Sequence, residues 1–203
     1  MHRNCSICGL DGVYKCQDCL AQPLFCTACC RVLHQLTPFH SIRQWTGTFF
    51  QQSCLADAGL IIHLGHDATG CAAADDGWDI FDGDEAEDEI DPEDNPSMPG
   101  PRYKLRGAEM LIVDTSGVHR LQIRCCQCPA AERPDVQLFW AGLFPASFIN
   151  PKTVFTFAVL DDFLLDNLEC GTSAMNYYSK LRRTTSSAFP HLVPVTIHDA
   201  FPV

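Results

Sequence analysis

The first forty residues hold three cysteine pairs of the form Cys-x-x-Cys, and two histidines follow the third pair. Two ligands at this spacing can close a tight turn around one tetrahedral zinc ion. In chain order the candidate ligands are Cys5, Cys8, Cys16, Cys19, Cys26, Cys29, His34 and His40. Eight ligands predict two metal sites, and thiolate and imidazole donors favour zinc over calcium or magnesium. Buried or disulfide-bonded cysteines are the alternative interpretation, but they require neither the repeated spacing nor the trailing histidines.

Each predicted site has four protein ligands, which leaves no open position for a reacting water, so we expect structural rather than catalytic metals. Forty residues are too few to build a sufficient apolar core, and metal binding supplies the missing folding free energy. Cys30 directly follows Cys29 and is a spare ligand.

The order of the pairs allows two ways of sharing the ligands between the metals. Sequential pairing puts the first two cysteine pairs on one zinc. Interleaved pairing puts Cys5, Cys8, Cys26 and Cys29 on zinc 1, and Cys16, Cys19, His34 and His40 on zinc 2. The interleaved order resembles the cross-brace of B-box and related zinc fingers, and this resemblance favours it.

A third zinc site is predicted from residues on both sides of an acidic segment. Residues two apart on an extended chain point to the same side, so Cys126 and Cys128 can hold one metal. His66 and Cys71 would complete the site. His119 competes for the histidine place and Cys125 for a sulfur. The alternative is that these are reduced core cysteines, as we also expect for the isolated Cys54 and Cys170.

The elements that must position these ligands are a hairpin and three helices. Residues 109–114 and 118–124 read as strands joined by a turn at 115–117. A short helix is predicted over 51–58, ended by Gly59, and the aromatic side chains just before it are expected to pack on the finger. Two longer helices are predicted over 152–168 and 173–183, with Asn150 or Pro151 starting the first and Gly171 ending it. A turn is predicted at 144–146.

The net charge of −11 comes from one segment, because 12 of the 25 acidic residues lie between Asp75 and Asp94. Without that segment, 14 basic residues face 13 acidic ones. Such a run repels itself and reads as a solvated, disordered insertion. The predicted organisation is a double-zinc finger over 1–50, a connecting helix and the first half of the third cluster over 51–71, the acidic and proline-rich insertion over 72–102, a hairpin, CxC cluster and two helices over 103–185, and a loose tail over 186–203.

No apolar stretch is long enough to span a bilayer, and the opening residues lack the apolar core of a signal peptide. We therefore expect a reducing, intracellular compartment, in which a cysteine cluster reads as a metal site rather than as disulfides.

Several motifs together resemble the CxC-type cysteine cluster found next to KDZ transposases, chiefly in mushroom-forming fungi. They are the Cys-x-x-Cys pairs, Trp45-x-Gly47-x-Phe49-Phe50, Leu64-Gly65-His66-x4-Cys71, Asp114-x2-Gly117-Val118-His119, Cys126-x-Cys128 and Gln137-Leu138-x5-Phe144-Pro145-Ala146. The resemblance runs from Cys5 to about Thr185. It implies a zinc-binding module that stands before a transposase catalytic domain and serves DNA or chromatin contact in the nucleus.

The predicted fold class is accordingly a small zinc-stabilised α+β protein: a B-box-like cross-brace finger followed by a hairpin and helix body. The predicted function is DNA or chromatin contact, without the transposase catalytic domain. A B-box-like module that binds protein and no nucleic acid is the alternative. The basic groups Arg102, Lys104, Arg106 and Lys180, Arg182, Arg183 could contact phosphates.

Catalysis is not expected. Residues 111–117 resemble the first strand of a ribonuclease-H-like nuclease, whose leading Asp would be Asp114, with Asp161 or Asp162 and Glu169 as further carboxylates. Such a site needs carboxylates that converge from separate elements onto two metals. Asp161 and Asp162 fall inside a predicted helix, and a hairpin-turn role explains Asp114 better. We also expect no small-molecule substrate and no membrane partner.

Overall fold

A computed structural model describes residues 3–66, 70–71, 109–148 and 151–194. The predicted acidic insertion over 72–102 lies wholly outside this part, as do Arg102, Lys104 and Arg106. The elements are β1 (Tyr14–Cys16), β2 (Leu24–Phe25), α1 (Thr27–Leu33), β3 (Ile42–Trp45), β4 (Phe50–Ser53), β5 (Ile61–His63), β6 (Glu109–Asp114), β7 (Gly117–Arg124), α2 (Pro134–Trp140), β8 (Leu143–Pro145), β9 (Thr153–Thr156), α3 (Phe157–Cys170), α4 (Ala174–Thr185) and the 3-10 helix η2 (Pro190–Leu192). The fold is α+β, as predicted.

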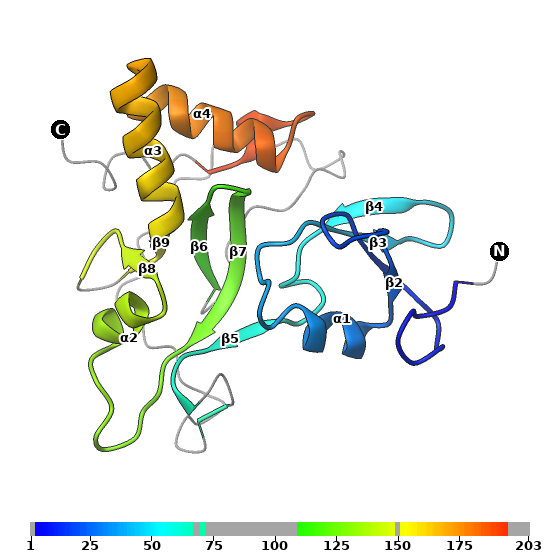
Figure 1. The fold of residues 1–203 in the computed structure, drawn as a ribbon. Coiled ribbons are helices and arrows are strands. Elements are labelled where there is room, and N and C mark those ends of the chain that lie inside the picture. The colour runs from blue at the N-terminus through cyan, green and yellow to red at the C-terminus, as the bar shows by residue number, and fades with distance from the viewer. Residues whose placement is uncertain (1–2, 67–69, 72–108, 149–150, 195–203) are drawn as a thin grey trace, which may run out of the picture.

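The N-terminal finger is built on a small antiparallel sheet with strand order β2-β1-β3-β4. Tyr14 and Cys16 on β1 and Ile42 on β3 are buried, and Cys16 lies opposite Ile42. Helix α1 follows β2 directly and begins at its N-cap, Cys26. The finger forms one end of the molecule (Figure 1), and β5 runs from it toward the second sheet.

The second sheet has five strands in the order β5-β7-β6-β9-β8. The predicted hairpin is confirmed: β6 and β7 pair antiparallel from Glu109–Gln122 to Asp114–Gly117. Beside the hairpin, β5 pairs parallel with β7 and β9 pairs parallel with β6. The sheet is therefore mixed, and its central strand β6 comes from the middle of the chain.

Alternate residues of β6 belong to two different cores. Met110 and Ile112 join the apolar cluster that also contains Tyr14, Phe25 and Ile42 of the finger. Leu111 and Val113 join the cluster formed with α3 and α4. A strand that is covered on both faces reads as a continuous apolar run, which explains the sequence of residues 110–113. The finger and the helices thus share one sheet between them.

Helices α3 and α4 lie at one end of the sheet (Figure 1) and carry the expected end signals. The Thr156 hydroxyl accepts a hydrogen bond from the Val159 N–H at the start of α3. Gly171 ends α3 with a left-handed φ of 63°, a conformation that favours glycine. Ser173 caps α4 in the same way as Thr156 caps α3. The position predicted for Gly171 is confirmed.

Four local predictions are wrong, and in three of them strand pairing overrides a local signal. Residues 51–58 form no helix, because Phe50–Ser53 pairs with β3 as strand β4 and turns follow it. Residues 153–156 are strand β9 rather than the first turn of α3, so the helix begins at Phe157 after Thr156 and not after Asn150 or Pro151. Residues 143–145 form an edge strand, where a proline is tolerated. The fourth, the predicted loose tail, is instead anchored as far as Pro194, because Val193 is buried and the Tyr178 hydroxyl donates to the Pro194 carbonyl at 2.7 Å.

No helix in the described part of the chain is long and apolar enough to cross a membrane.

Candidate metal centres

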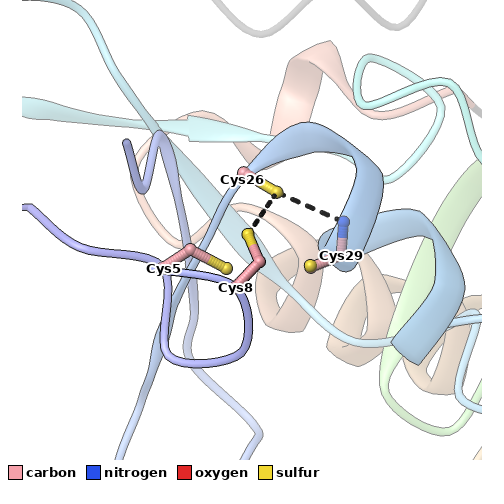
Figure 2. Close-up of side chains that lie close together, drawn as sticks. All are labelled: Cys5, Cys8, Cys26 and Cys29. Carbon is pink, nitrogen blue, oxygen red and sulfur yellow. Dashed lines mark hydrogen bonds between the residues drawn. The ribbon is translucent and has the colours of Figure 1, made fainter. Parts of the chain in front are cut away.

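The first tetrad joins a loop of the finger to the start of α1. Figure 2 shows the sulfur atoms of Cys5, Cys8, Cys26 and Cys29 pointing toward one another. The Sγ atoms of Cys8 and Cys26 lie 3.6 Å apart. A tetrahedral zinc with bonds near 2.3 Å separates its sulfur ligands by about 3.8 Å. The Cys29 N–H donates to the Cys26 Sγ at 3.5 Å, so the backbone already faces the thiolates.

The second tetrad consists of Cys16 and Cys19, at the end of β1, and His34 and His40, which follow α1. His34 Nε2 lies 3.3 Å from the Cys16 Sγ and 3.7 Å from the Cys19 Sγ. His40 Nδ1 lies 3.5 Å from both sulfurs. These distances match the edges of about 3.6 Å expected between nitrogen and sulfur ligands of one zinc. The ligands are therefore grouped in the interleaved order and not in the sequential one.

The hydrogen bonds of His34 identify which of its nitrogens faces the metal position. His34 Nδ1 lies 2.7 Å from the Cys30 carbonyl oxygen, to which only an N–H can donate. Burial acts to lower the pKa of His34, but its hydrogen bonds to Cys16 and Cys30 outweigh burial and raise this pKa to about 11. A metal at Nε2 would displace the proton of that nitrogen while Nδ1–H keeps its bond to Cys30, an arrangement common among metal-bound histidines. Cys30 is fully buried behind this ring and lies outside both tetrads. It supports His34 through its backbone and is not the spare ligand that we predicted.

The third tetrad lies at the seam between the two halves. His66 Nε2 is 3.1 Å from the Cys126 Sγ and 3.4 Å from the Cys128 Sγ. The Cys71 Sγ is 3.8 Å from both of these sulfurs. The structure thus brings together the four residues that we expected to close across the acidic segment. The competitors are elsewhere: Cys125 is buried in the core, and His119 contacts Ser116 and Phe39.

Two neighbours of the ligands, Gln137 and Gly65, hold the third tetrad in shape. The Gln137 side chain on α2 accepts from the Cys126 N–H at 2.7 Å and donates to the Cys126 carbonyl at 3.0 Å. Gly65 has a φ of +85°, and a Cβ at this position would lie 3.1 Å from the Cys126 Cβ. Both residues occur in the motifs that carry the family resemblance, but neither residue type by itself predicts a supporting role at a metal site.

Within each finger tetrad the protons are distributed unevenly. Burial acts to raise the pKa of Cys5, but backbone N–H groups, chiefly those of Cys8 and Cys26, outweigh it and lower this pKa to about 6. Burial likewise acts against ionisation of Cys16, yet the hydrogen bonds from His34 and the Cys19 N–H lower its pKa to about 6. In contrast, the neighbouring Cys26 thiol raises the pKa of Cys29 to about 12.

The same competition is present at the third tetrad, where the thiols of Cys126 and Cys71 raise the pKa of Cys128 to about 11. Adjacent thiolates repel one another, so without a cation each tetrad keeps some of its protons. A divalent cation removes this repulsion and displaces the protons. The donor atoms, their spacing and their charge all fit a zinc ion held by four protein ligands.

In each of the three groups, the four ligand atoms lie within 4.8 Å of one another. Among the described residues, Cys54 and Cys170 belong to none of these groups. Neither is the buried apolar side chain that we expected. Cys170 is exposed at the end of α3, and the half-buried Cys54 thiol donates to the Asp57 carboxylate at 3.1 Å.

The carboxylates considered for nuclease chemistry do not form a shared site. Asp114 accepts hydrogen bonds from the Ser116 hydroxyl at 2.6 Å and from the Thr156 hydroxyl at 2.8 Å. These contacts outweigh burial and keep the pKa of Asp114 below its usual value. On α3, Asp162 binds the Tyr177 hydroxyl at 2.5 Å, while Asp161 and Glu169 face solvent. Asp114 therefore shapes the turn between β6 and β7.

Comparison with known proteins assigns the second half of the chain. Residues 94–188 match the family described as a CxC2-like cysteine cluster associated with KDZ transposases. The match includes Cys126 and Cys128 and begins after His66 and Cys71, so it is shorter than the resemblance that we drew from the motifs. No curated protein and no solved structure matches the chain. Residues 94–188 are therefore similar to the CxC2-like cysteine cluster associated with KDZ transposases.

Proposed function

We propose that this chain is a structural zinc module of a KDZ-transposase-like protein, that it binds three zinc ions, and that it contacts DNA or chromatin. The tetrads support the zinc content, because twelve donors lie at ligand spacing in three separate groups. The family match supports the association with a transposase. The finger sheet supplies the observation that carries DNA contact.

The outer face of the finger sheet carries a row of cationic and amide side chains. Lys15 on β1 lies directly opposite Arg43 on β3, and Arg43 lies opposite Gln52 on β4. Residues directly opposite in an antiparallel pair point to the same face. Trp45, two residues after Arg43, shares this face and packs on Phe50 with ring centroids 5.0 Å apart. Basic groups beside aromatic rings suit a nucleic-acid backbone.

The end of α4 adjoins this row. The Gln52 side-chain amide donates to the Thr185 carbonyl at 2.9 Å. Arg182 and Arg183 belong to the last turn of α4, so they add positive charge next to the row. Lys180 differs from them, because it pairs with Asp162 at 3.6 Å and with Asp166 at 3.1 Å. We therefore assign phosphate contact to Lys15, Arg43, Arg182 and Arg183.

Salt-dependent binding of the zinc-loaded chain to a random duplex tests this function. Each phosphate contact changes the slope of log K against log salt by about 0.9. We expect the Lys15→Gln/Arg43→Gln variant to lower that slope by about 2. Arg133→Gln is the matched control, since Arg133 already pairs with Asp135 at 3.0 Å. Absence of duplex binding by the wild-type protein, even at low salt, would exclude the proposal.

A B-box-like protein-interaction role is the second candidate, and the finger also offers an observation in its favour. Leu20, Val32 and Leu36 are apolar and are 97%, 73% and 87% exposed. Exposed apolar side chains of this size would gain free energy if a protein partner covered them. This role would be established if the zinc-loaded chain did not bind duplex DNA and instead bound a protein through Leu20, Val32 and Leu36. A DNA or chromatin role would place the chain in the nucleus.

The proposed module performs no chemistry. Each tetrad fills its metal with protein ligands, and such sites are structural. Ser116 and His119 lie 2.9 Å apart, as a nucleophile and its base would. However, the Ser116 hydroxyl donates its proton to Asp114, so His119 donates to the Ser116 oxygen and cannot activate it. We propose that the hydrogen bonds among Asp114, Ser116 and His119 stabilise the turn between β6 and β7.

A further inference from the structure

Helix α3 carries apolar side chains on two sides, and the described part of the chain covers only one of them. Val159 is the buried residue of its inner side, which faces the sheet and α4. On the other side, Leu164, Leu165 and Leu168 are 54%, 60% and 69% exposed. A helix that is apolar on both sides is usually buried on both. Figure 1 shows α3 extending beyond the sheet, with α4 packed along one side of it.

The exposed leucines are part of a continuous surface. Phe157, Leu164, Leu165 and Leu168 recur at spacings that place them on one face of a helix. The Phe157 ring contacts Phe139 of α2 at a centroid distance of 5.0 Å in an edge arrangement. Phe139 is itself 51% exposed. We call the surface formed by Phe139, Phe157, Asp161, Leu164, Leu165 and Leu168 the outer α3 face.

The charge on this face is negative. Asp161 lies in line with the leucines, four residues after Phe157, and Glu169 follows Leu165 by four. Both carboxylates are exposed, and within the described ranges no lysine or arginine forms an ion pair with either. Asp162 and Asp166, on the inner side, are the carboxylates that pair with Lys180. The outer acids are thus available to a partner.

These charges decide which occupant fits. In a parallel pairing of α3 with a second copy, Asp161 would face Asp161, and in an antiparallel pairing it would lie among leucines. Either arrangement buries a carboxylate without a counter-charge, which is costly. An anionic membrane surface would also be repelled. A helix with an apolar stripe and a flanking lysine or arginine meets both requirements.

We propose that the outer α3 face is a docking site for an amphipathic helix of another protein, with apolar anchors over the leucines and a basic residue opposite Asp161. This site is separate from the finger surface assigned to DNA, so the two functions can be tested independently. In this binding mode an amphipathic helix packs on an apolar surface, and its anchor side chains recur every three or four residues.

The probe for this proposal is a synthetic helical peptide with leucines along one stripe and lysines beside it, titrated into the zinc-loaded full chain. We expect Leu164→Gln/Leu168→Gln to raise its Kd by about tenfold or more. Leu10→Gln, at a finger leucine that is 66% exposed, is the matched control and should leave the Kd unchanged. The substituted leucines are exposed, so the thermal midpoint should stay near that of the parent protein.

A charge exchange separates docking on this face from general attraction to an acidic protein. Asp161→Lys should weaken the binding of the lysine peptide. It should also allow the binding of a peptide in which glutamate replaces lysine. Equal affinities of the parent and leucine variants would overturn the proposal. So would self-association that the leucine variants abolish, since it would place a second copy on this face, or leucine-dependent adsorption to phosphatidylserine vesicles.

Discussion

The finger and the sheet-helix body differ in what stabilises their folds. In the finger, β1 to β4 span two to four residues each and α1 spans seven. Elements this short bury little apolar area, and helices of this length are marginal in water. In the body, β6 is covered on both faces and the hairpin extends over six residue pairs. We therefore expect the finger to depend on its ligands for stability, whereas the body can rely on apolar burial.

The third tetrad is informative because it belongs to both regions. His66 and Cys71 follow β5, which comes from the finger side, and Cys126 and Cys128 follow β7 of the body. A metal at this position cross-links the two halves of the chain across the segment between them. The difference between the regions predicts how strongly each one is destabilised when metal is lost. The loss of stability should be largest in the finger, intermediate at the third tetrad and smallest in the strands of the body.

The largest effect should follow loss of a finger ligand. Cys16→Ser removes a buried donor of the second tetrad, and structural zinc contributes about 10 kcal/mol or more to the folding of small fingers. We expect the amides of β1 and β3 to exchange rapidly with solvent while those of β6 and β9 stay protected. Hydrogen exchange read by mass spectrometry measures both regions in one experiment.

Cys170→Ser is the control for that variant, because this exposed thiol lies outside the three tetrads. It should change neither zinc content nor exchange. If the finger amides of the Cys16 variant, or of the chelated protein, remained protected, apolar packing alone would hold the finger and the comparison would fail.

The seam variant Cys126→Ser/Cys128→Ser should have the next largest effect. Zinc content should fall by one ion per chain, and the protein should lose about 4 kcal/mol, the value expected for a cross-link that closes a loop of this length. Protection of the β5 amides should fall first, because β5 pairs with the strand that ends at this site. Metal analysis and chemical denaturation measure the two quantities.

Cys125→Ala tests whether the effect is specific, since Cys125 is the buried neighbour in the same run and lies outside the tetrad. It should reduce stability slightly and keep the full zinc content. An unchanged zinc content in the double variant would instead assign Cys126 and Cys128 to the core.

How far the sequence predicts this molecule depends on whether the signal is local. Ligand spacing is local, so the pairs Cys5–Cys8 and Cys26–Cys29 could be recognised and then joined. The hairpin was also predictable, because its strands are adjacent and only Thr115-Ser116 separates them. Strand β9 could not be predicted, because its apolar residues run without a break into those of α3, and only pairing with β6 and β8 makes it a strand.

Residues that support the sites were harder to foresee than the ligands. Gln137 contacts Cys126 from a helix that the sequence pattern did not indicate. The burial of Cys30 behind His34 depends on how α1 packs, and its spacing alone suggested a ligand. Distant contacts of this kind depend on tertiary packing, and a single sequence carries no direct record of it.

A smaller effect is expected from Arg120, which links the two regions by charge. Arg120 is 7% exposed and pairs with Glu109 of β6 at 3.3 Å and with Asp57 of the finger segment at 3.7 Å. Arg120→Met leaves both carboxylates without this partner, at a cost of about 2–4 kcal/mol. Denaturant unfolding measures this loss. Arg133→Met removes an exposed pair and should cost less than about 1 kcal/mol; equal losses would mean that the buried pairs do not couple the regions.

The smallest effect is a pH dependence that comes from His119 on β7. Burial lowers the pKa of His119 to about 4, below its ordinary value of 6.5. The unfolded chain then binds a proton at a higher pH than the folded one, so stability falls as pH decreases from about 6.5 toward 4. Because the ring is only partly buried, we expect about 1 kcal/mol between pH 7 and 5. The difference in unfolding free energy between the parent and His119→Gln should shrink by this amount on acidification, whereas His191→Gln, on the exposed turn of η2, should follow the parent at every pH. Acid release of zinc affects all three proteins alike, so a constant difference between the parent and His119→Gln would show that His119 does not contribute.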